Sequence, residues 1–217
     1  MSTAVLEPPP QAPPPPTQPP AGGRRSVGEL LSEEPSAWPR VTKDEYHRMI
    51  ERGLLEFGGR WELLDGYIVR MPAHSPEHAD AIDRIVERLF ELFRKDYQVS
   101  CQLPVTLEGA WEPEPDVVLR SRRDRRDGGH PTAEEVVLAV EVGRTSGRTD
   151  RDVKLPKYAA CGIPEVWLVD VHGKAVHVFR EPTGETYASQ QTFTGDAAFG
   201  VAAKPGPTLT AAEVFGP

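Results

Sequence analysis

The sequence predicts an α/β domain in which a mixed β-sheet is flanked by helices. Three observations carry this prediction: helical spacing near 78–95, strand-like runs between 98 and 142, and a second helical segment at 150–161 that leads into another strand-like run. The order helix, strands, helix, strand is typical of a sheet covered by helices. The chain has 217 residues, 38% hydrophobic and 27% charged, which suits one domain with a real core.

A proline-rich tail begins the chain. Residues 1–25 are dominated by proline and contain few side chains that a core could bury. We therefore predict a disordered tail and assign residues 26–217 to a single domain.

A short helix and a hairpin are expected first in this domain. Thr42 and Glu45 have the spacing of a capping box for a helix that runs to about Arg52. The stretch 61–72 reads as two short strands, with an Asp-Gly turn at 65–66.

The central segment predicts a long helix followed by strands. Between 78 and 95 the apolar residues share one helical face: Ile82, Ile85, Val86, Leu89, Phe90 and Phe93. Strands are then expected at 98–107, 116–120 and 136–142. The last of these is a nearly unbroken apolar run, which favours a strand covered on both faces.

A second helix and three further strands complete the prediction. The helix runs from about Asp150 to Cys161, and Gly162 is expected to end it in a left-handed conformation. Strands follow at 165–170, 175–180 and 186–193, before an end rich in proline and glycine.

Charge and cysteine content narrow the classes of function. The net charge of −8 argues against a general polyanion binder, but a local basic groove for weak or transient DNA contact is compatible with it. Five arginines lie at 120–126, either in a DNA-contacting loop or in a solvated one.

Cys101 and Cys161 do not have the spacing of metal ligands, and we expect both to be reduced, buried thiols. No apolar run has the length of a membrane span, so a cytoplasmic protein without membrane contact is expected.

Two carboxylates occupy suggestive strand positions. Asp116 opens one predicted strand, and Glu141 lies near the end of the next, where a buried carboxylate needs a compensating cation. If these strands are neighbours, both carboxylates reach one sheet edge, and with the Val142 carbonyl they would suit Mg²⁺ or Mn²⁺. Catalysis at such a site would also need a lysine, to stabilise the negative charge that develops in the transition state. Position 143 is glycine, so Lys154 on the following helix is the candidate.

Four stretches resemble one known family in the same order along the chain. They are "WELLDGYIVRMP" at 61–72, "PDVVL" at 115–119, "VEV" at 140–142 and "DRDVKLPKYAACGIPEVWLVD" at 150–170. Together they look like the Uma-two family of restriction-endonuclease-like proteins, within the PD-(D/E)xK nuclease superfamily. The resemblance covers roughly residues 38–215.

The resemblance implies a restriction-endonuclease-like αβββαβ core, to which the N-terminal helix and hairpin are additions. It implies Asp116 and Glu141 as metal ligands, Lys154 as a migrated substitute for the strand lysine, and Glu62 as a further acidic residue of the site. One departure concerns the loop after Glu141, which reads "EVGRTS" where relatives often have a serine sooner. The implied function is an Mg²⁺- or Mn²⁺-dependent endonuclease acting on DNA, and nucleases of this fold often work as homodimers.

Each candidate residue also has a purely structural interpretation. Asp116 could cap a turn, Glu141 could pair with Arg144, and Glu62 could be a polar position on a half-exposed strand. Lys154 could form an exposed pair with Asp150 one turn earlier, with Lys157 as its rival for the catalytic role. The alternative function is a catalytically inactive nucleic-acid-binding or assembly protein on the same fold. An interaction module working through the proline tail has least support.

Overall fold

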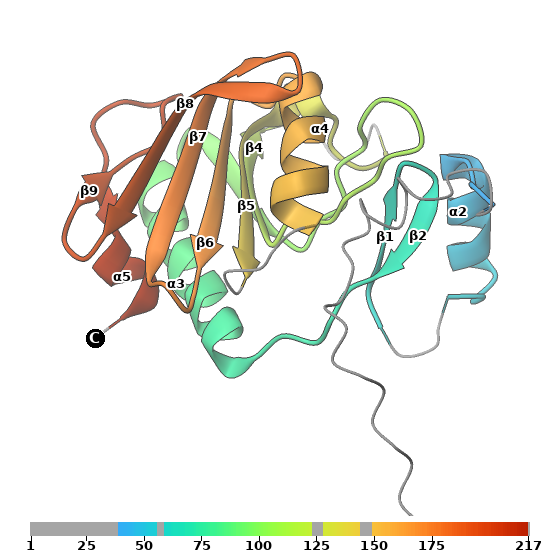
Figure 1. The fold of residues 1–217 in the computed structure, drawn as a ribbon, viewed down its shortest axis with the longest axis horizontal. Helices are drawn as coiled ribbons and strands as arrows, with labels where there is room; N and C mark the ends of the chain where they lie inside the picture. The colour runs from blue at the N-terminus through green and yellow to red at the C-terminus, as the bar shows by residue number, and fades with distance from the viewer. Residues whose placement is uncertain (1–38, 56–58, 123–127, 144–148, 217) are drawn as a thin grey trace, which may run out of the picture.

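Within the described residues, six strands form one mixed sheet (Figure 1). The computed structural model describes residues 39–55, 59–122, 128–143 and 149–216. In spatial order the strands are β3 (Tyr97–Cys101), β4 (Val117–Ser121), β5 (Val136–Gly143), β6 (Glu165–Asp170), β7 (Ala175–Thr183) and β8 (Thr186–Thr194). All neighbours are antiparallel except β5 and β6. The predicted α/β architecture, a mixed sheet flanked by helices, is confirmed.

The parallel pair β5–β6 requires a crossover, which the chain makes through a helix in two parts. A π-helical segment, Thr149–Lys154, runs directly into α4 (Leu155–Ala160). The sequence predicted one regular helix over this stretch. Pro156 in the first turn of α4 lacks an N–H to donate to the preceding turn, which accords with the change of helical geometry there. Such π turns are frequent at functional sites.

Helices cover both faces of the sheet (Figure 1). The helices α3 (Pro76–Phe93) and α5 (Ala211–Phe215) pack on one face, and α4 packs on the other. Along β5 the side chains of Leu138, Val140 and Val142 join the α3 core, whereas Ala139 joins the α4 core. This explains the unbroken apolar run of β5. By the same alternation, Glu141 faces α4.

Several predicted boundaries shift for identifiable reasons. The helix α3 begins at Pro76, because the Ser75 side chain accepts a hydrogen bond from the His78 amide and caps it. The strand expected at 98–107 stops at Cys101, since Gln102 adopts a φ of 47°.

The C-terminal elements were not predicted from the sequence. They are the short strand pair β9 (Ala198–Phe199) and β10 (Leu209–Thr210), together with α5. A capping box formed by Thr210 and Glu213 begins α5. The capping box was not recognised in the sequence, because the surrounding prolines and glycines indicated an irregular end.

A helix and a hairpin lie beside the main sheet (Figure 1). They are α2 (Lys43–Glu51), with its predicted capping box at Thr42, and the strands β1 (Trp61–Leu64) and β2 (Tyr67–Arg70). Asp65 and Gly66 turn the hairpin with φ values of 51° and 81°, as a type I′ turn needs. Two backbone hydrogen bonds between Leu63 and Glu112, of 3.2 and 2.8 Å, join β1 to the segment before β4.

Gly162 ends α4 as predicted, with a φ of 76°. The Ile163 amide donates to the Tyr158 carbonyl at 3.0 Å, and the Gly162 amide donates to the Ala159 carbonyl at 2.9 Å. These two bonds define a Schellman motif, and the buried side chains of Ile163 and Tyr158 share one core cluster.

The structure differs from the sequence-based expectation at one cysteine and one arginine. Cys101 is exposed rather than buried, because it ends an outer strand of the sheet. Arg120 belongs to β4 and is buried, so it is no part of an arginine loop. The predicted tail at 1–25, residues 123–127 with three of the five arginines, and Arg144 lie outside the described residues. Among the described helices, none is long and apolar enough to cross a membrane.

Candidate active site

Asp116 and Glu141 lie across from each other on neighbouring strands. The last paired residues of β4 and β5 are Val117 and Val140, so one further step places Asp116 opposite Glu141. Residues directly opposite in an antiparallel pair point to the same face. Both residues are 3% exposed, so two carboxylates are buried side by side at the end of a strand pair.

The ammonium of Lys154 lies among three carboxylates. Its Nζ atom is 2.9 Å from Glu62 Oε2, 3.2 Å from Glu141 Oε2 and 3.4 Å from Asp150 Oδ1. Each partner comes from a different element: β1, β5 and the π-helical segment. The lysine side chain is only 2% exposed, so it is not the solvated helix pair that the sequence left open as an alternative.

Tyr158 fixes the second oxygen of Glu141. Its hydroxyl donates to Glu141 Oε1 at 2.6 Å, from a position one turn after Lys154 on the crossover helix. Leu155 also faces the sheet, whereas Lys157 places its ammonium 5.4 Å from the centre of the Trp111 ring. The crossover helix therefore turns Lys154 and Tyr158 toward Glu141 and Lys157 away from it.

The buried cluster has more acidic groups than basic ones. Burial raises the pKa of Glu141 well above its ordinary value, and Lys154 offsets only part of this. Burial acts in the opposite direction on Lys154, but attraction to Glu141, Glu62 and Asp150 outweighs it and holds the lysine pKa well above its usual range. Burial also raises the pKa of Asp150. One ammonium thus contacts three carboxylates and does not fully offset the burial of Glu141 and Asp150.

Asp116 has a different environment, rich in hydrogen-bond donors. Its Oδ2 atom accepts from the Val142 amide at 2.8 Å, and its Oδ1 atom lies 3.3 Å from His78 Nε2. Burial raises the pKa of Asp116, but the hydrogen bonds from His78 and Val142 outweigh it, so this pKa lies below its ordinary value. Asp116 is accordingly held ionised beside the more basic Glu141.

Two histidines that the sequence did not assign to the site lie next to Asp116. His74 and His78 stack with ring centres 4.0 Å apart, and His74 Nε2 lies 3.8 Å from Asp116 Oδ1. Burial lowers the pKa of His74, and the neighbouring His78 and Arg60 lower it further. The available signal was their spacing of four residues across the start of a helix, which by itself does not point to a strand carboxylate.

Glu62, Val142 and Gly143 lie beside Lys154, Asp116 and Asp150, respectively. Glu62 lies on β1, and its Oε2 atom also accepts from the Glu114 amide at 3.3 Å. Val142 contributes its amide to Asp116, whereas the sequence suggested its carbonyl as a ligand. A side chain at the glycine of position 143 would begin 3.7 Å from Asp150 Oδ2, so a lysine there would start beside the same acidic cluster.

The donor set suits a hard divalent cation. Glu62, Glu141 and Asp116 offer carboxylate oxygens, which Mg²⁺ and Mn²⁺ prefer. Three carboxylates surround one ammonium, and a divalent ion would replace the protons that the raised pKa values of Glu141 and Asp150 favour. His74, His78 and Asp116 also bring one ligand atom each within 4.8 Å of one another. At this edge of the sheet, His74, His78 and Asp116 therefore have the spacing for one metal ion, and Glu141 lies opposite Asp116 on the adjoining strand.

Comparison with known proteins agrees with this architecture. A crystal structure titled a "putative nuclease belonging to DUF820", from Anabaena variabilis, superposes with a TM-score of 0.59 at 15% sequence identity. The match covers 81% of this chain and 97% of that one, and at this identity it establishes the fold alone. No curated protein matches significantly. The profile of the Uma2 family, described as "Putative restriction endonuclease", matches residues 44–212, and the chain therefore belongs to the Uma2 family.

Proposed function

We propose that the protein is a metal-dependent endonuclease that hydrolyses phosphodiester bonds in DNA. The observation that carries the proposal is the buried Lys154 ammonium, held by Glu62 and Glu141 beside Asp116 on the adjoining strand. A nuclease of this kind needs carboxylates for a metal ion and a cation for the developing phosphorane charge. This cluster contains both, at the edge where β4 begins and β5 ends.

In this proposal Asp116 and Glu141 hold Mg²⁺ or Mn²⁺, with Glu62 as a third oxygen donor. The ion, when bound, lowers the pKa of a water molecule and neutralises charge on the phosphate. Asp116 is suited to the ligand role because its depressed pKa keeps it ionised. Glu141 must lose a proton or exchange its Lys154 contact, since burial raises its pKa.

Lys154 acts as the electrostatic catalyst of the proposed reaction. Its raised pKa keeps the ammonium charged in a buried setting, where a fixed charge is more effective than in water. The Tyr158 hydrogen bond orients Glu141, which in turn helps to position the Lys154 ammonium. Lys157 is a poorer candidate for this role, because its ammonium lies over Trp111.

DNA as substrate, its weak or transient binding, and dimerisation to cut both strands belong to the same proposal. The net charge of −8 disfavours tight binding to a polyanion, which supports short-lived contact through local basic residues.

One observation favours the alternative of a catalytically inactive nucleic-acid-binding protein on this fold. Lys154 already contacts both Glu62 and Glu141, so the core of the cluster is paired without any added ion. If that pairing is permanent, metal ions would neither bind here nor alter DNA binding. Metal titration therefore separates the two functions.

The direct test is cleavage of supercoiled plasmid DNA by the full chain with Mg²⁺ or Mn²⁺. We expect nicked and linear products that disappear with a chelator and in Asp116→Asn. In Lys154→Met the rate should fall by about a hundredfold to a thousandfold, as for loss of one preorganised charge donor.

The matched control is Asp196→Asn, which removes an exposed carboxylate in the turn before β9. It should cut like the unmodified chain. Cleavage by Asp116→Asn at the unmodified rate would refute the proposed site, and metal-independent binding of plasmid without cleavage would favour the alternative. A structured RNA tested in parallel decides between DNA and RNA.

A further inference from the structure

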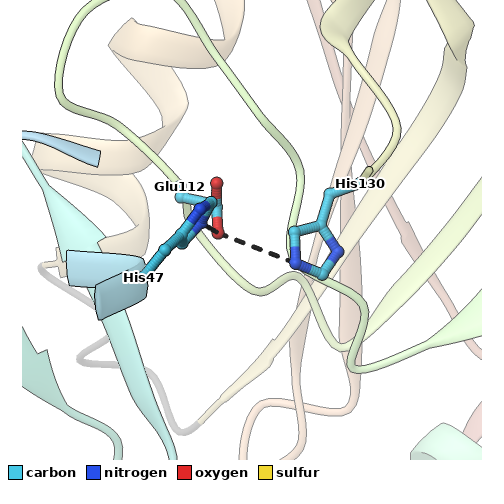
Figure 2. Close-up of side chains that lie close together, drawn as sticks. All are labelled: His47, Glu112 and His130. Carbon is cyan, nitrogen blue, oxygen red and sulfur yellow. Dashed lines mark hydrogen bonds and ion pairs between the residues drawn. The ribbon is translucent and has the colours of Figure 1, made fainter. Parts of the chain in front are cut away.

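A second cluster of metal-ligating side chains lies outside the candidate active site (Figure 2). It consists of His47 on α2, Glu112 in the segment before β4, and His130 in the segment before β5. One ligand atom from each lies within 4.8 Å of the other two. Figure 2 shows both imidazole rings turned toward the same carboxylate.

The buried carboxylate of Glu112 is the centre of this cluster. Its side chain is 1% exposed, and among the described residues its ion pairs are with the two histidines. Both contacts use one oxygen: Oε1 lies 2.8 Å from His47 Nε2 and 3.8 Å from His130 Nε2. The other oxygen, Oε2, accepts from the Thr106 hydroxyl at 3.3 Å. Thr106 thus orients the carboxylate so that Oε1 faces the two rings.

The spacing of these atoms suits a transition-metal ion. Zinc bonds of roughly 2.0–2.2 Å in a tetrahedral arrangement put neighbouring ligand atoms about 3.4 Å apart. The observed separations of 2.8 and 3.8 Å from Glu112 Oε1 lie on either side of that value, and the two histidine nitrogens lie within 4.8 Å of each other, so side-chain rotations would bring all three atoms to one ion.

The backbone positions of the three residues are already fixed. Glu112 exchanges two hydrogen bonds with Leu63, and the Thr106 amide donates to the Pro131 carbonyl at 2.8 Å, next to His130. His47 follows Tyr46, which is buried and donates to the Trp61 carbonyl at 2.8 Å. Ligands on fixed backbones are what a metal site with measurable affinity requires.

The nearby cation does not satisfy Glu112. Lys43 lies one turn before His47 on α2, but its ammonium donates to the Leu107 carbonyl at 2.8 Å. Among the described residues, the side-chain partners of this carboxylate are therefore the two imidazoles and the Thr106 hydroxyl, and neutral imidazole is the form that binds metal ions. The rings are 41% and 39% exposed, which leaves a solvent-facing position for a water ligand.

We propose that His47, Glu112 and His130, with water as the fourth ligand, form a site for Zn²⁺ or a similar borderline metal ion, separate from the proposed Mg²⁺ site. Two nitrogens and one oxygen select zinc-like ions, whereas carboxylates alone select Mg²⁺. The ion ties α2 to the segment that pairs with β1, through Leu63 and Glu112. Because Glu62 precedes Leu63, this tie also holds Glu62 in the active-site cluster, whether or not the chain cleaves DNA.

For the test, the full chain is stripped of metal with a chelator, reloaded with Zn²⁺ and passed through gel filtration. The zinc that it retains is then measured by inductively coupled plasma mass spectrometry. Variants are His130→Asn, whose side chain is exposed enough to leave folding intact, and His172→Asn, an exposed control in the turn after β6. We expect one zinc equivalent fewer in His130→Asn and no change in His172→Asn. Thr106→Val should weaken zinc affinity by about 10- to 100-fold, since it removes the carboxylate's orienting partner.

A second readout separates this site from His74 and His78. Zinc should raise the melting temperature of the unmodified chain more than that of His130→Asn, and millimolar Mg²⁺ should not displace it. Equal zinc content in the unmodified chain and His130→Asn would overturn the proposal, whether that content is zero or reflects binding at the other histidine pair.

Discussion

Replacing Lys154 with methionine tests the buried charge cluster through stability rather than activity. Methionine keeps much of the side-chain volume but removes the ammonium that contacts Glu62, Glu141 and Asp150 at 2.9–3.4 Å. At an effective dielectric constant of about 20, each such contact corresponds to about 5 kcal/mol of attraction. The cost of desolvating the lysine offsets much of this sum, and breaking a buried ion pair typically destabilises by about 3–5 kcal/mol.

The loss should depend on pH with a definite sign. Glu141 has a folded-state pKa above its ordinary value of 4.5, so stability is lost as pH rises through that folded value. Lys154 lowers this pKa, and its removal raises it further, which deepens the loss at higher pH. Urea unfolding should therefore show a larger deficit for Lys154→Met at pH 8 than at pH 5.

Lys157→Met is the matched control, three residues further along the helix. It removes a cation over the Trp111 ring, 5.4 Å from its centre, which is worth about 1 kcal/mol or less. If Lys154→Met unfolded at the same urea concentration as the unmodified chain at pH 8, or if its deficit were equal at both pH values, the ammonium would not neutralise Glu141.

Three further outcomes are expected. Tyr158→Phe removes the 2.6 Å hydrogen bond to Glu141 and should lower the unfolding free energy by about 1.5–3 kcal/mol, whereas an unchanged urea midpoint would mean that the bond is dispensable. Gly162→Val should cost about 1–2 kcal/mol in thermal unfolding, because open space surrounds the added Cβ and only the φ of 76° opposes it. The depressed pKa of His74 favours its neutral form in the folded protein, so the free energy of unfolding should fall as pH drops below about 6.5. In His74→Gln, urea unfolding should show a smaller difference in stability between pH 7.5 and pH 5.5 than in the unmodified chain.

Most elements of the fold were predicted from local sequence patterns. The apolar run of β5 indicated a strand with two covered faces, and helices now cover both. The Asp-Gly turn at 65–66 and the glycine that ends α4 were predictable because their backbone conformations favour those residue types. The capping box of α2 was predictable for the same reason.

Long-range pairings were harder to predict from the sequence. His78 contacts Asp116, a carboxylate 38 residues further along the chain, and Glu112 contacts histidines on both sides of it in the chain. No periodicity links such positions, since only the folded topology brings them together. The π-helical turn before Pro156 was missed because helical spacing does not distinguish π from α geometry over a single turn.

The proposed site also makes Lys154 and the metal ion competitors for the same oxygens. Glu141 cannot serve both fully, because Tyr158 and Lys154 already occupy its two oxygens. Loss of the ammonium should therefore leave Mn²⁺ affinity unchanged or increase it, while cleavage falls. A variant that lost metal affinity and cleavage together would instead place Lys154 in a purely architectural role.

If Asp116 and Glu141 hold one divalent cation together, counting bound Mn²⁺ tests this most directly. Electron paramagnetic resonance measures free Mn²⁺ during titration of the full chain, and the His130→Asn background removes the second cluster from the count. We predict one bound Mn²⁺ per chain, lost in Asp116→Asn and in Glu141→Gln, and bound at least as tightly in Lys154→Met. Undiminished Mn²⁺ binding by both carboxylate variants would contradict a metal site at this edge of the sheet.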